Sequence, residues 1–150
     1  MKKSVLIIDD DFDFSLLVSK FLNQNGYETQ IATSGESAIS KLRKFEFHAV
    51  LCDFCLGDMD GKEFLLNLKK RNLETIVIFM TGYANQKTAS DILELGAYDY
   101  LEKPLIPGEI LLALSDAFAK SSSTYKKDQN FSFNGHNENK ASFSSNSFML

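Results

Sequence analysis

The sequence predicts an α/β fold in which five helices cover a doubly wound, five-stranded parallel sheet. The main observation is that, before residue 120, short apolar runs alternate regularly with amphipathic stretches, as in repeated strand–helix units. Short connections between these units predict right-handed crossovers, with helices on both faces of the sheet. The length of 150 residues fits one domain, and a hydrophobic share of 44% is enough to form its core.

Five apolar runs are the expected strands. The first, residues 5–8, is apolar throughout and contains β-branched residues, which is typical of a strand covered on both faces. The other expected strands are residues 27–32, 49–52, 75–80 and 98–101. Residues 27–32 form the most polar of these runs, so we expect this strand at or near an edge of the sheet.

Apolar residues at helical spacing predict the helices that follow the strands. The five apolar sets are Phe14, Leu17, Val18, Phe21 and Leu22; Ala38, Ile39 and Leu42; Phe64, Leu65 and Leu68; Ala89, Ile92, Leu93 and Leu95; and Ile110, Leu111, Leu114 and Phe118. We expect Asp11 or Asp13 to cap the first helix and Gly26 to close it. Ser34 is expected to cap the second helix, and Pro107 to open the last one.

The composition changes near residue 120. Residues 1–120 are predicted to form the domain, whereas residues 121–150 are dominated by Ser, Asn and Lys without a helical or alternating period. This composition predicts a disordered tail. An alternative remains, in which the tail becomes ordered when its aromatic residues enter a groove of a partner: Phe131, Phe133, Phe143 and Phe148.

Charge and composition argue against several classes of function. The chain has 20 acidic and 16 basic residues and a net charge of −4, which argues against a surface for nucleic acid or anionic lipid. Two cysteines are too few for a disulfide scaffold. No apolar run approaches the roughly 20 residues that span a bilayer, and none fits a signal peptide. We therefore expect a cytoplasmic protein without membrane insertion.

Polar residues follow the expected strands at the points where the strands end. Asp9 and Asp10 follow the first strand, Asp53 the third, Thr81 the fourth and Lys103 the fifth. Because the carboxyl ends of parallel strands meet at one edge of a sheet, we expect these groups to share a crevice. Neighbouring carboxylates repel one another more than one lysine can balance, which predicts a hard divalent cation such as Mg²⁺. Together the groups predict phosphoryl chemistry on a carboxylate nucleophile, although each alone also fits a turn or a cap.

Five motifs occur in a fixed order along the chain. They are VLIIDDD at residues 5–11, AVLCD at 49–53, LGDMDG at 56–61, FMTG at 79–82 and GAYDYLEKP at 96–104. With these motifs the chain resembles a response-regulator receiver domain of bacterial two-component signalling, from residue 4 to about residue 120. The resemblance implies a flavodoxin-like fold with strand order 2-1-3-4-5, and a stand-alone regulator of the chemotaxis type.

The resemblance also implies which residues accept the phosphoryl group and bind the metal ion. Asp53 is the phosphoacceptor, and its donor is a histidine kinase or a histidine phosphotransfer protein. Asp10, Asp53 and the backbone carbonyl of Cys55 bind Mg²⁺ directly, and Asp9 contributes through water. The protein is then a signalling phosphoacceptor in a phosphorelay and not an enzyme, although it assists its own phosphorylation and dephosphorylation.

Further roles implied by the resemblance concern the switch. Thr81 and Lys103 each contact a phosphoryl oxygen, and Tyr100 is the aromatic side chain that turns inward when Thr81 is drawn to the phosphate. The change reshapes the surface of the fourth helix, fifth strand and fifth helix for a downstream protein target. The bond between Lys103 and Pro104 is expected to be cis. The kinase is expected to dock near Phe14, Leu17 and the loop at Leu105, although these two α-helical residues fit a core role equally well.

Three departures and two alternatives accompany this interpretation. Gly57 replaces the usual Pro of the family, which predicts a more flexible loop, and Cys55 and Tyr83 occupy positions that tune the phosphoryl lifetime. The large Tyr83 is expected to slow hydrolysis. The Cys52–Cys55 pair is interpreted as incidental, since Cys52 lies within a buried strand. The alternatives are a pseudo-receiver that binds proteins without phosphorylation, and a small phosphohydrolase, for which no lid insertion is evident.

Overall fold

The structure, a computed structural model, describes residues 2–82 and 86–124. Five strands form one parallel sheet in the order β2-β1-β3-β4-β5. They are β1 (Lys3–Ile8), β2 (Tyr27–Ala32), β3 (Ala49–Asp53), β4 (Ile76–Thr81) and β5 (Asp99–Glu102). The predicted fold class and strand order are confirmed, and the polar strand β2 lies at an edge as expected.

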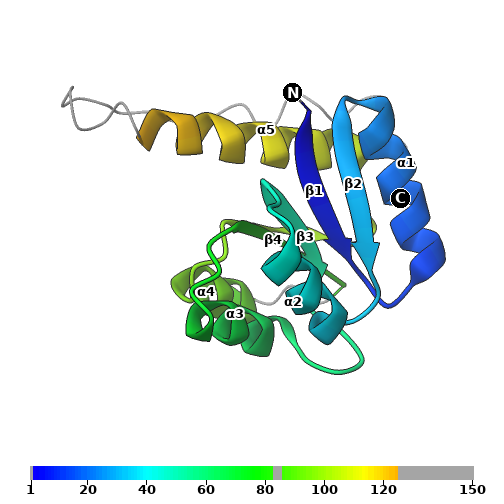
Figure 1. The fold of residues 1–150 in the computed structure, drawn as a ribbon. Coiled ribbons are helices and arrows are strands. Elements are labelled where there is room, and N and C mark those ends of the chain that lie inside the picture. Colours follow the sequence, from blue (N-terminus) through cyan, green and yellow to red (C-terminus); the bar gives the residue numbers. More distant parts are fainter. Residues whose placement is uncertain (1, 83–85, 125–150) are drawn as a thin grey trace.

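Helices cover both faces of this sheet, as Figure 1 shows. They are α1 (Phe12–Gln24), α2 (Gly35–Lys44), α3 (Gly61–Lys70), α4 (Gln86–Glu94) and α5 (Pro107–Thr124). The helices α2, α3 and α4 pack on one face, and α1 and α5 pack on the other. No helix in residues 2–82 and 86–124 is long and apolar enough to cross a membrane.

The alternating side chains of the strands divide the core into two layers. In β1, Leu6 and Ile8 face the layer under α2, α3 and α4, whereas Val5 and Ile7 face the layer under α1 and α5. All four side chains are fully buried. This burial on both faces explains why the strand is apolar at every position.

Capping residues begin the helices close to the carboxyl edge of the sheet. Asp11 accepts a hydrogen bond from the backbone N–H of Phe14 and is the N-cap of α1. Ser34 forms a capping box with Ser37 at the start of α2, and Asp60 caps α3. The caps predicted at Asp11 and Ser34 are confirmed.

Two residues predicted on buried helical faces are exposed. Leu17 is 56% exposed and Leu93 is 43% exposed, so their assignment to the core is wrong. Leu17 precedes the buried Val18 by one residue, and Leu93 follows the buried Ile92 by one residue. One residue is about 100° of helical rotation, which carries both side chains off the face that the sheet covers.

The last helix is longer than the sequence predicts. It continues past Lys120 to Thr124, across the serines that were assigned to the tail. The hydroxyl of Ser121 donates a hydrogen bond of 3.1 Å to the carbonyl of Phe118, so a serine here is accommodated within the helix.

The remaining tail, residues 125–150, and Tyr83 lie outside the described residues. The bond between Lys103 and Pro104 is cis, as expected.

Candidate functional site

The carboxyl edge of the sheet collects most of the residues selected from the sequence. Asp9 directly follows β1, Asp53 ends β3, Thr81 ends β4 and Lys103 directly follows β5. The backbone N–H of Lys103 donates to the carbonyl of Thr81 at 2.8 Å, which joins the ends of β4 and β5. The parallel register therefore places side chains that are distant in sequence in one crevice.

Three carboxylates converge in this crevice. One oxygen from each of Asp9, Asp10 and Asp53 lies within 4.8 Å of the other two. Asp9 is only 1% exposed, Asp53 is intermediate and Asp10 is open to solvent. The cluster is thus buried at its base and open at its mouth, so that an ion or a phosphoryl group can enter from solvent.

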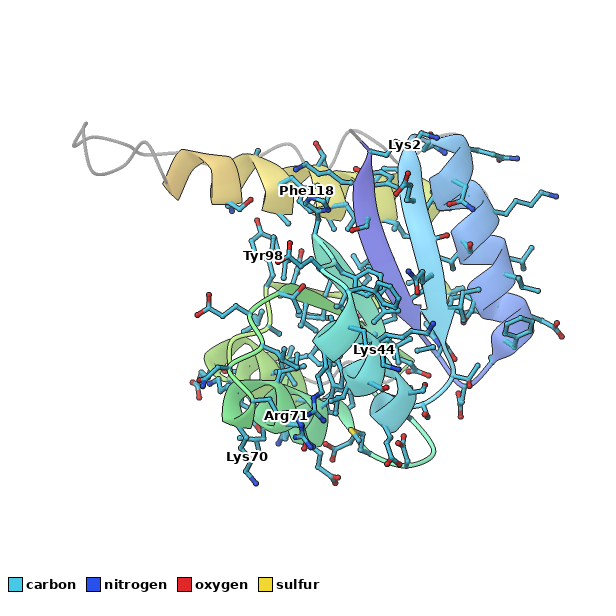
Figure 2. All side chains as sticks on the ribbon, viewed as in Figure 1. Lys2, Lys44, Lys70, Arg71, Tyr98 and Phe118 are labelled. Carbon is cyan, nitrogen blue, oxygen red and sulfur yellow. The ribbon has the colours of Figure 1, made fainter. Side chains whose placement is uncertain are left out.

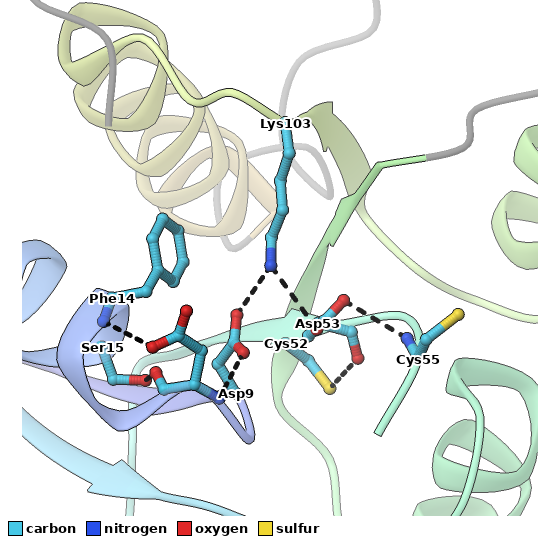
Figure 3. A network of polar contacts seen from close by, with 8 residues as sticks. Asp9, Phe14, Ser15, Cys52, Asp53, Cys55 and Lys103 are labelled. Atoms are coloured by element: carbon cyan, nitrogen blue, oxygen red, sulfur yellow. Dashed lines mark hydrogen bonds and ion pairs between the residues drawn. The ribbon is translucent and has the colours of Figure 1, made fainter. Parts of the chain in front are cut away.

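Lys103 lies between two of these carboxylates, as Figure 3 shows. Its Nζ is 2.8 Å from Oδ2 of Asp9 and 3.5 Å from Oδ2 of Asp53. The other oxygen of Asp9 accepts the backbone N–H of Asp11 at 2.9 Å. Both oxygens of Asp9 therefore have partners within the protein, one of which is the ammonium group of Lys103.

Burial and neighbouring charges shift the pKa values of both Asp53 and Lys103. Burial raises the pKa of the Asp53 carboxyl; attraction by Lys103 opposes this shift, and repulsion by Asp9 adds to it, with a net rise. Burial lowers the pKa of Lys103, but its hydrogen bond to Asp9 and the charge of Asp53 outweigh this and raise it. Lys103 therefore remains an ammonium ion, whereas the ionised form of Asp53 is disfavoured relative to a carboxylate in water.

This donor set fits a hard divalent cation. Oxygen ligands from several carboxylates, with room for water, are what Mg²⁺ prefers in proteins. The charge of such an ion would favour the ionised form of Asp53, and it would neutralise phosphoryl oxygens beside the carboxylates. The backbone of Cys55 is next to this position, since its N–H donates to Oδ1 of Asp53 at 3.3 Å.

Phe14, which the sequence suggested as a docking or core residue, contacts the ammonium group of Lys103. Its ring centroid lies 4.6 Å from Nζ of Lys103, within the range of a cation–π contact. Figure 3 shows the ring beside the lysine side chain. The sequence predicted a docking or core role for Phe14, but no local signal connects it to a lysine after β5.

Asp58 is a second residue whose role the sequence missed. Its two carboxylate oxygens accept the backbone N–H groups of Gly35 and Glu36 at 2.9 and 3.0 Å. Its limited burial raises the pKa of its carboxyl, but these bonds outweigh that and lower the pKa. The loop after Asp53 is thereby attached to the start of α2, despite Gly57 in its centre.

Thr81 and Tyr100 lie on adjacent strands behind the crevice. Thr81 is buried at the end of β4. Tyr100 of β5 is partly buried and packs against the core layer of α2, α3 and α4, and its register partner on β4 is Phe79. Tyr100 is thus an aromatic residue on the strand next to Thr81, and its role as a switch stays a prediction.

The two cysteines show no sign of redox chemistry. Cys52 is buried, Cys55 is exposed, and both are free thiols. Burial, together with the charge of Asp53, raises the pKa of Cys52 well above its ordinary value, so the reactive thiolate is disfavoured. The thiol of Cys52 donates to the carbonyl of Asp53 at 3.2 Å. The interpretation of this pair as incidental agrees with the structure.

Comparison with protein families matches residues 5–115 to the response regulator receiver domain. The chain belongs to this family. A receiver domain is a signalling phosphoacceptor of two-component systems rather than an enzyme in the usual sense, and receiver domains interact with histidine kinases. The carboxylates of Asp9, Asp10 and Asp53 are typical of the magnesium site of receiver domains and are consistent with phospho-aspartate signalling.

Curated relatives are longer than this receiver chain. It is 38% identical over 115 residues to the transcriptional regulatory protein ZraR of Klebsiella oxytoca, a match that covers 77% of the chain and 26% of the relative. It is 38% identical over 113 residues to the acid tolerance regulatory protein ActR of Sinorhizobium medicae, covering 75% of the chain and 58% of the relative. The chain thus spans about a quarter of ZraR and somewhat over half of ActR.

Solved receiver structures agree with the fold over nearly their whole length. A CheY-like receiver domain from Methanospirillum hungatei superposes with a TM-score of 0.77 at 29% identity, covering 83% of this chain and 99% of that one. The chemotaxis response regulator CheY4 of Vibrio cholerae gives 0.73 at 26% identity, covering 78% and 99%.

Proposed function

We propose that this receiver accepts a phosphoryl group on Asp53, with Mg²⁺ as its cofactor, and passes the signal to a partner protein. The observation that supports this most directly is the arrangement of Asp9, Asp10 and Asp53 around the ammonium group of Lys103. This arrangement has an ionisable nucleophile, acidic ligands for a divalent ion and a cation for phosphoryl oxygens. In the proposed metal site, Asp10, Asp53 and the carbonyl of Cys55 are direct ligands.

The transfer of the phosphoryl group to Asp53 involves only a few side chains. An oxygen of Asp53 attacks the phosphorus of a phosphohistidine, a new O–P bond forms, and the N–P bond of the donor breaks. The electron pair of that bond returns to the imidazole, which takes up a proton. Lys103 and Thr81 then each contact a phosphoryl oxygen, and Tyr100 turns inward as Thr81 moves. We assign these steps to the domain of residues 1–120 and expect the protein to work in the cytoplasm.

The phosphoryl donor is a histidine kinase or a histidine phosphotransfer protein, and α1 offers it an apolar surface. Leu105 is buried and Phe14 is only partly exposed, so of the docking residues expected from the sequence only Leu17 presents a large surface. Phe12 and Leu16 of the same helix are also exposed. We infer that the donor docks on these three side chains of α1, next to the crevice.

Intact-protein mass spectrometry after incubation with acetyl phosphate and Mg²⁺ tests the proposal. The wild type is expected to gain the mass of one phosphoryl group. Asp53→Asn should gain none, because an amide oxygen is too poor a nucleophile. Asp13→Asn, on the exposed side of α1, is the matched control and should be labelled like the wild type. Labelling of Asp53→Asn at the wild-type level would exclude Asp53, and a wild type that is never labelled would favour the phosphorylation-independent binding module.

A further inference from the structure

Two carboxylates and one aromatic ring lie around the ammonium group of Lys103 in the crevice. Its Nζ is 2.8 Å from Oδ2 of Asp9 and 3.5 Å from Oδ2 of Asp53. It is also 4.6 Å from the ring centroid of Phe14, which Figure 3 shows beside the lysine side chain. A lysine has a flexible stem that cannot fix its ammonium group by itself. These neighbours therefore determine where the positive charge lies.

Phosphoryl transfer changes only one of these neighbours. In the proposed function, on which this inference rests, the carboxylate of Asp53 becomes an acyl phosphate and its negative charge passes to the phosphoryl oxygens. Asp9 and Phe14 take no part in the new bond, so they can hold Lys103 both before and after the transfer. Asp9 occupies one N–H of the ammonium group, whereas an aromatic face attracts the charge through its π electrons. The other N–H donors thus stay available for phosphoryl oxygens.

The position of the Phe14 ring is linked to that of Asp9 through the start of α1. Oδ1 of Asp9 accepts the backbone N–H of Asp11 at 2.9 Å, and Oδ1 of Asp11 accepts the backbone N–H of Phe14 at 3.1 Å. The buried Ser15 adds a hydrogen bond of 3.1 Å from its hydroxyl to the carbonyl of Asp11. This series of contacts returns to Asp9 through Lys103, so the ring and the carboxylate are placed on the ammonium group together.

Two other lysines lie over aromatic rings in the described part of the chain. Nζ of Lys3 is 4.9 Å from the ring centroid of Phe118, and Nζ of Lys120 is 5.8 Å from that of Tyr98; Figure 2 labels both rings. Lys3 is exposed and the side chain of Lys120 is 59% exposed, whereas that of Lys103 is 27% exposed. A cation–π contact becomes stronger as water is removed from it. The contact in the crevice is the shortest and the most sheltered of these, so its expected effect is the largest.

We propose that Phe14 is a positioning residue for phosphoryl transfer, whose ring holds the ammonium group of Lys103 in place for the phosphoryl group on Asp53. Phe14 also packs, partly buried, against the core layer of α1 and α5. An aliphatic side chain of similar size can provide that packing, but only an aromatic face attracts a cation. Leucine and tyrosine at position 14 therefore separate the positioning role from a packing role.

The rate of labelling by acetyl phosphate and Mg²⁺, followed by intact-protein mass spectrometry on the full chain, tests this inference. Acetyl phosphate needs no docking surface on α1, so the rate reports the crevice and not the binding of a protein donor. Phe14→Leu should be labelled about threefold more slowly, as expected for the loss of a partly sheltered cation–π contact. Phe14→Tyr keeps an aromatic face and should be labelled close to the wild-type rate. Phe21→Leu, at a partly buried position of the same helix and layer, is the matched control and should also match the wild type.

A second measurement reports the ring contact without any phosphorylation. Protons held over an aromatic face resonate upfield, so NMR of protein containing carbon-13-labelled lysine should show upfield Hε signals for Lys103. Lys103→Arg identifies these signals by removing them. They should move to ordinary positions in Phe14→Leu and stay upfield in Phe14→Tyr and Phe21→Leu. A loss of packing alone does not produce this pattern.

Contrary results would overturn the inference in distinguishable ways. Equal labelling rates in Phe14→Leu and the wild type would show that the ring does not serve the transfer. Labelling of Phe14→Tyr as slow as that of Phe14→Leu would show that packing, and not the aromatic face, is required. Unchanged Lys103 signals in Phe14→Leu would remove the contact itself. A wild type that is never labelled would instead contradict the proposed function, and the Lys103 signals would then decide alone on the ring contact.

Discussion

At the scale of single residues, the side chain of Lys103 lies between carboxylates and an aromatic ring in the crevice. Its ammonium group contacts Asp9 and Asp53 and lies against Phe14. Asp10 has no comparable partner among the ion pairs of the described residues and is open to solvent. The carboxylate that a metal ion can use most freely is therefore Asp10.

Replacing Asp10 by Ala should weaken Mg²⁺ binding at least tenfold, or about 1.4 kcal/mol, because a direct carboxylate ligand is lost. Calorimetric titration of Mg²⁺ into each protein measures the effect. In the absence of Mg²⁺ the variant should be as stable as the wild type or more stable, since repulsion with Asp9 and Asp53 is relieved. Asp13→Ala serves as the control, and equal affinities in the Asp10 variant and the wild type would contradict the assignment.

Tyr98 makes stability depend on alkaline pH. Its hydroxyl donates to Oδ2 of Asp116 at 3.2 Å, and burial, with the nearby charge of Asp116, raises the pKa of Tyr98 to about 12. The phenol of the unfolded chain, with an ordinary pKa of 10.0, ionises first. Stability contributed by the protonated phenol is thus present below pH 10 and is lost as the pH rises from 10 to 12.

Tyr98→Phe should therefore lose less stability than the wild type over this interval. Urea unfolding at pH 9 and pH 11.5 measures the free energy of unfolding of both proteins. At pH 9 the variant should be the less stable one, because Asp116 loses a hydrogen bond. An equal loss in both proteins between the two pH values would show that another group is responsible.

At the scale of elements, the side chain of Asp58 attaches the loop after β3 to the start of α2. Asp58 accepts two backbone N–H groups at the start of α2 in addition to the capping box of Ser34. The loop has its own contacts as well, since the N–H of Leu56 donates to the carbonyl of Met59 and that of Gly61 to the carbonyl of Phe54. The effect of Gly57 on the flexibility of this loop stays a prediction.

Asp58→Ala should lower the free energy of unfolding at pH 7 by about 1 kcal/mol, the usual effect of removing a helix cap. Asp58→Asn, which keeps one acceptor oxygen, should lose less. Because the pKa of Asp58 is lowered in the folded protein, its charged bonds stabilise above the ordinary value of 3.8 and are lost as the pH falls below it. Urea unfolding at pH 7 and at pH 3 measures this, and a difference between wild type and Asp58→Ala that is as large at pH 3 would contradict it.

At the scale of the whole molecule, all strands run in one direction and give the protein two unlike ends. The acidic crevice is at the carboxyl edge of the sheet, and a groove lined by residues 42–48 and 72–75 is at the amino edge. Helix direction supports this separation, since acidic caps begin α1 and α3 while cations end α2 and α3. The proposed switch concerns a third surface, formed by α4, β5 and α5.

Phosphorylation should alter this third surface and leave most other elements unchanged. If Thr81 and Tyr100 form the two-state element, hydrogen exchange with beryllofluoride and Mg²⁺ should change mainly in residues 86–124. Asp53→Asn with the same additions is the control and should show no change. Changes confined to residues 20–45 would contradict the proposed switch.

The sequence by itself determined the fold class, the strand order implied by the resemblance, and the position of Asp9, Asp53, Thr81 and Lys103 at strand ends. These features follow from local periodicity and chain direction, because every parallel strand delivers its next residue to the same edge. The helix caps Asp11 and Ser34 were predictable for the same local reason.

Only the tertiary structure decided which side chains meet across the chain. In the folded protein Leu17 and Leu93 are exposed, Phe14 lies against Lys103, and the segments 42–48 and 72–75 line one groove. Sequence spacing gives the side of a helix on which a residue lies only to within about 100°, the rotation of one residue. The sheet covers a narrower part of the helix surface than the part that the apolar residues occupy. Contacts between distant segments depend on how the layers pack, and no local pattern carries that information.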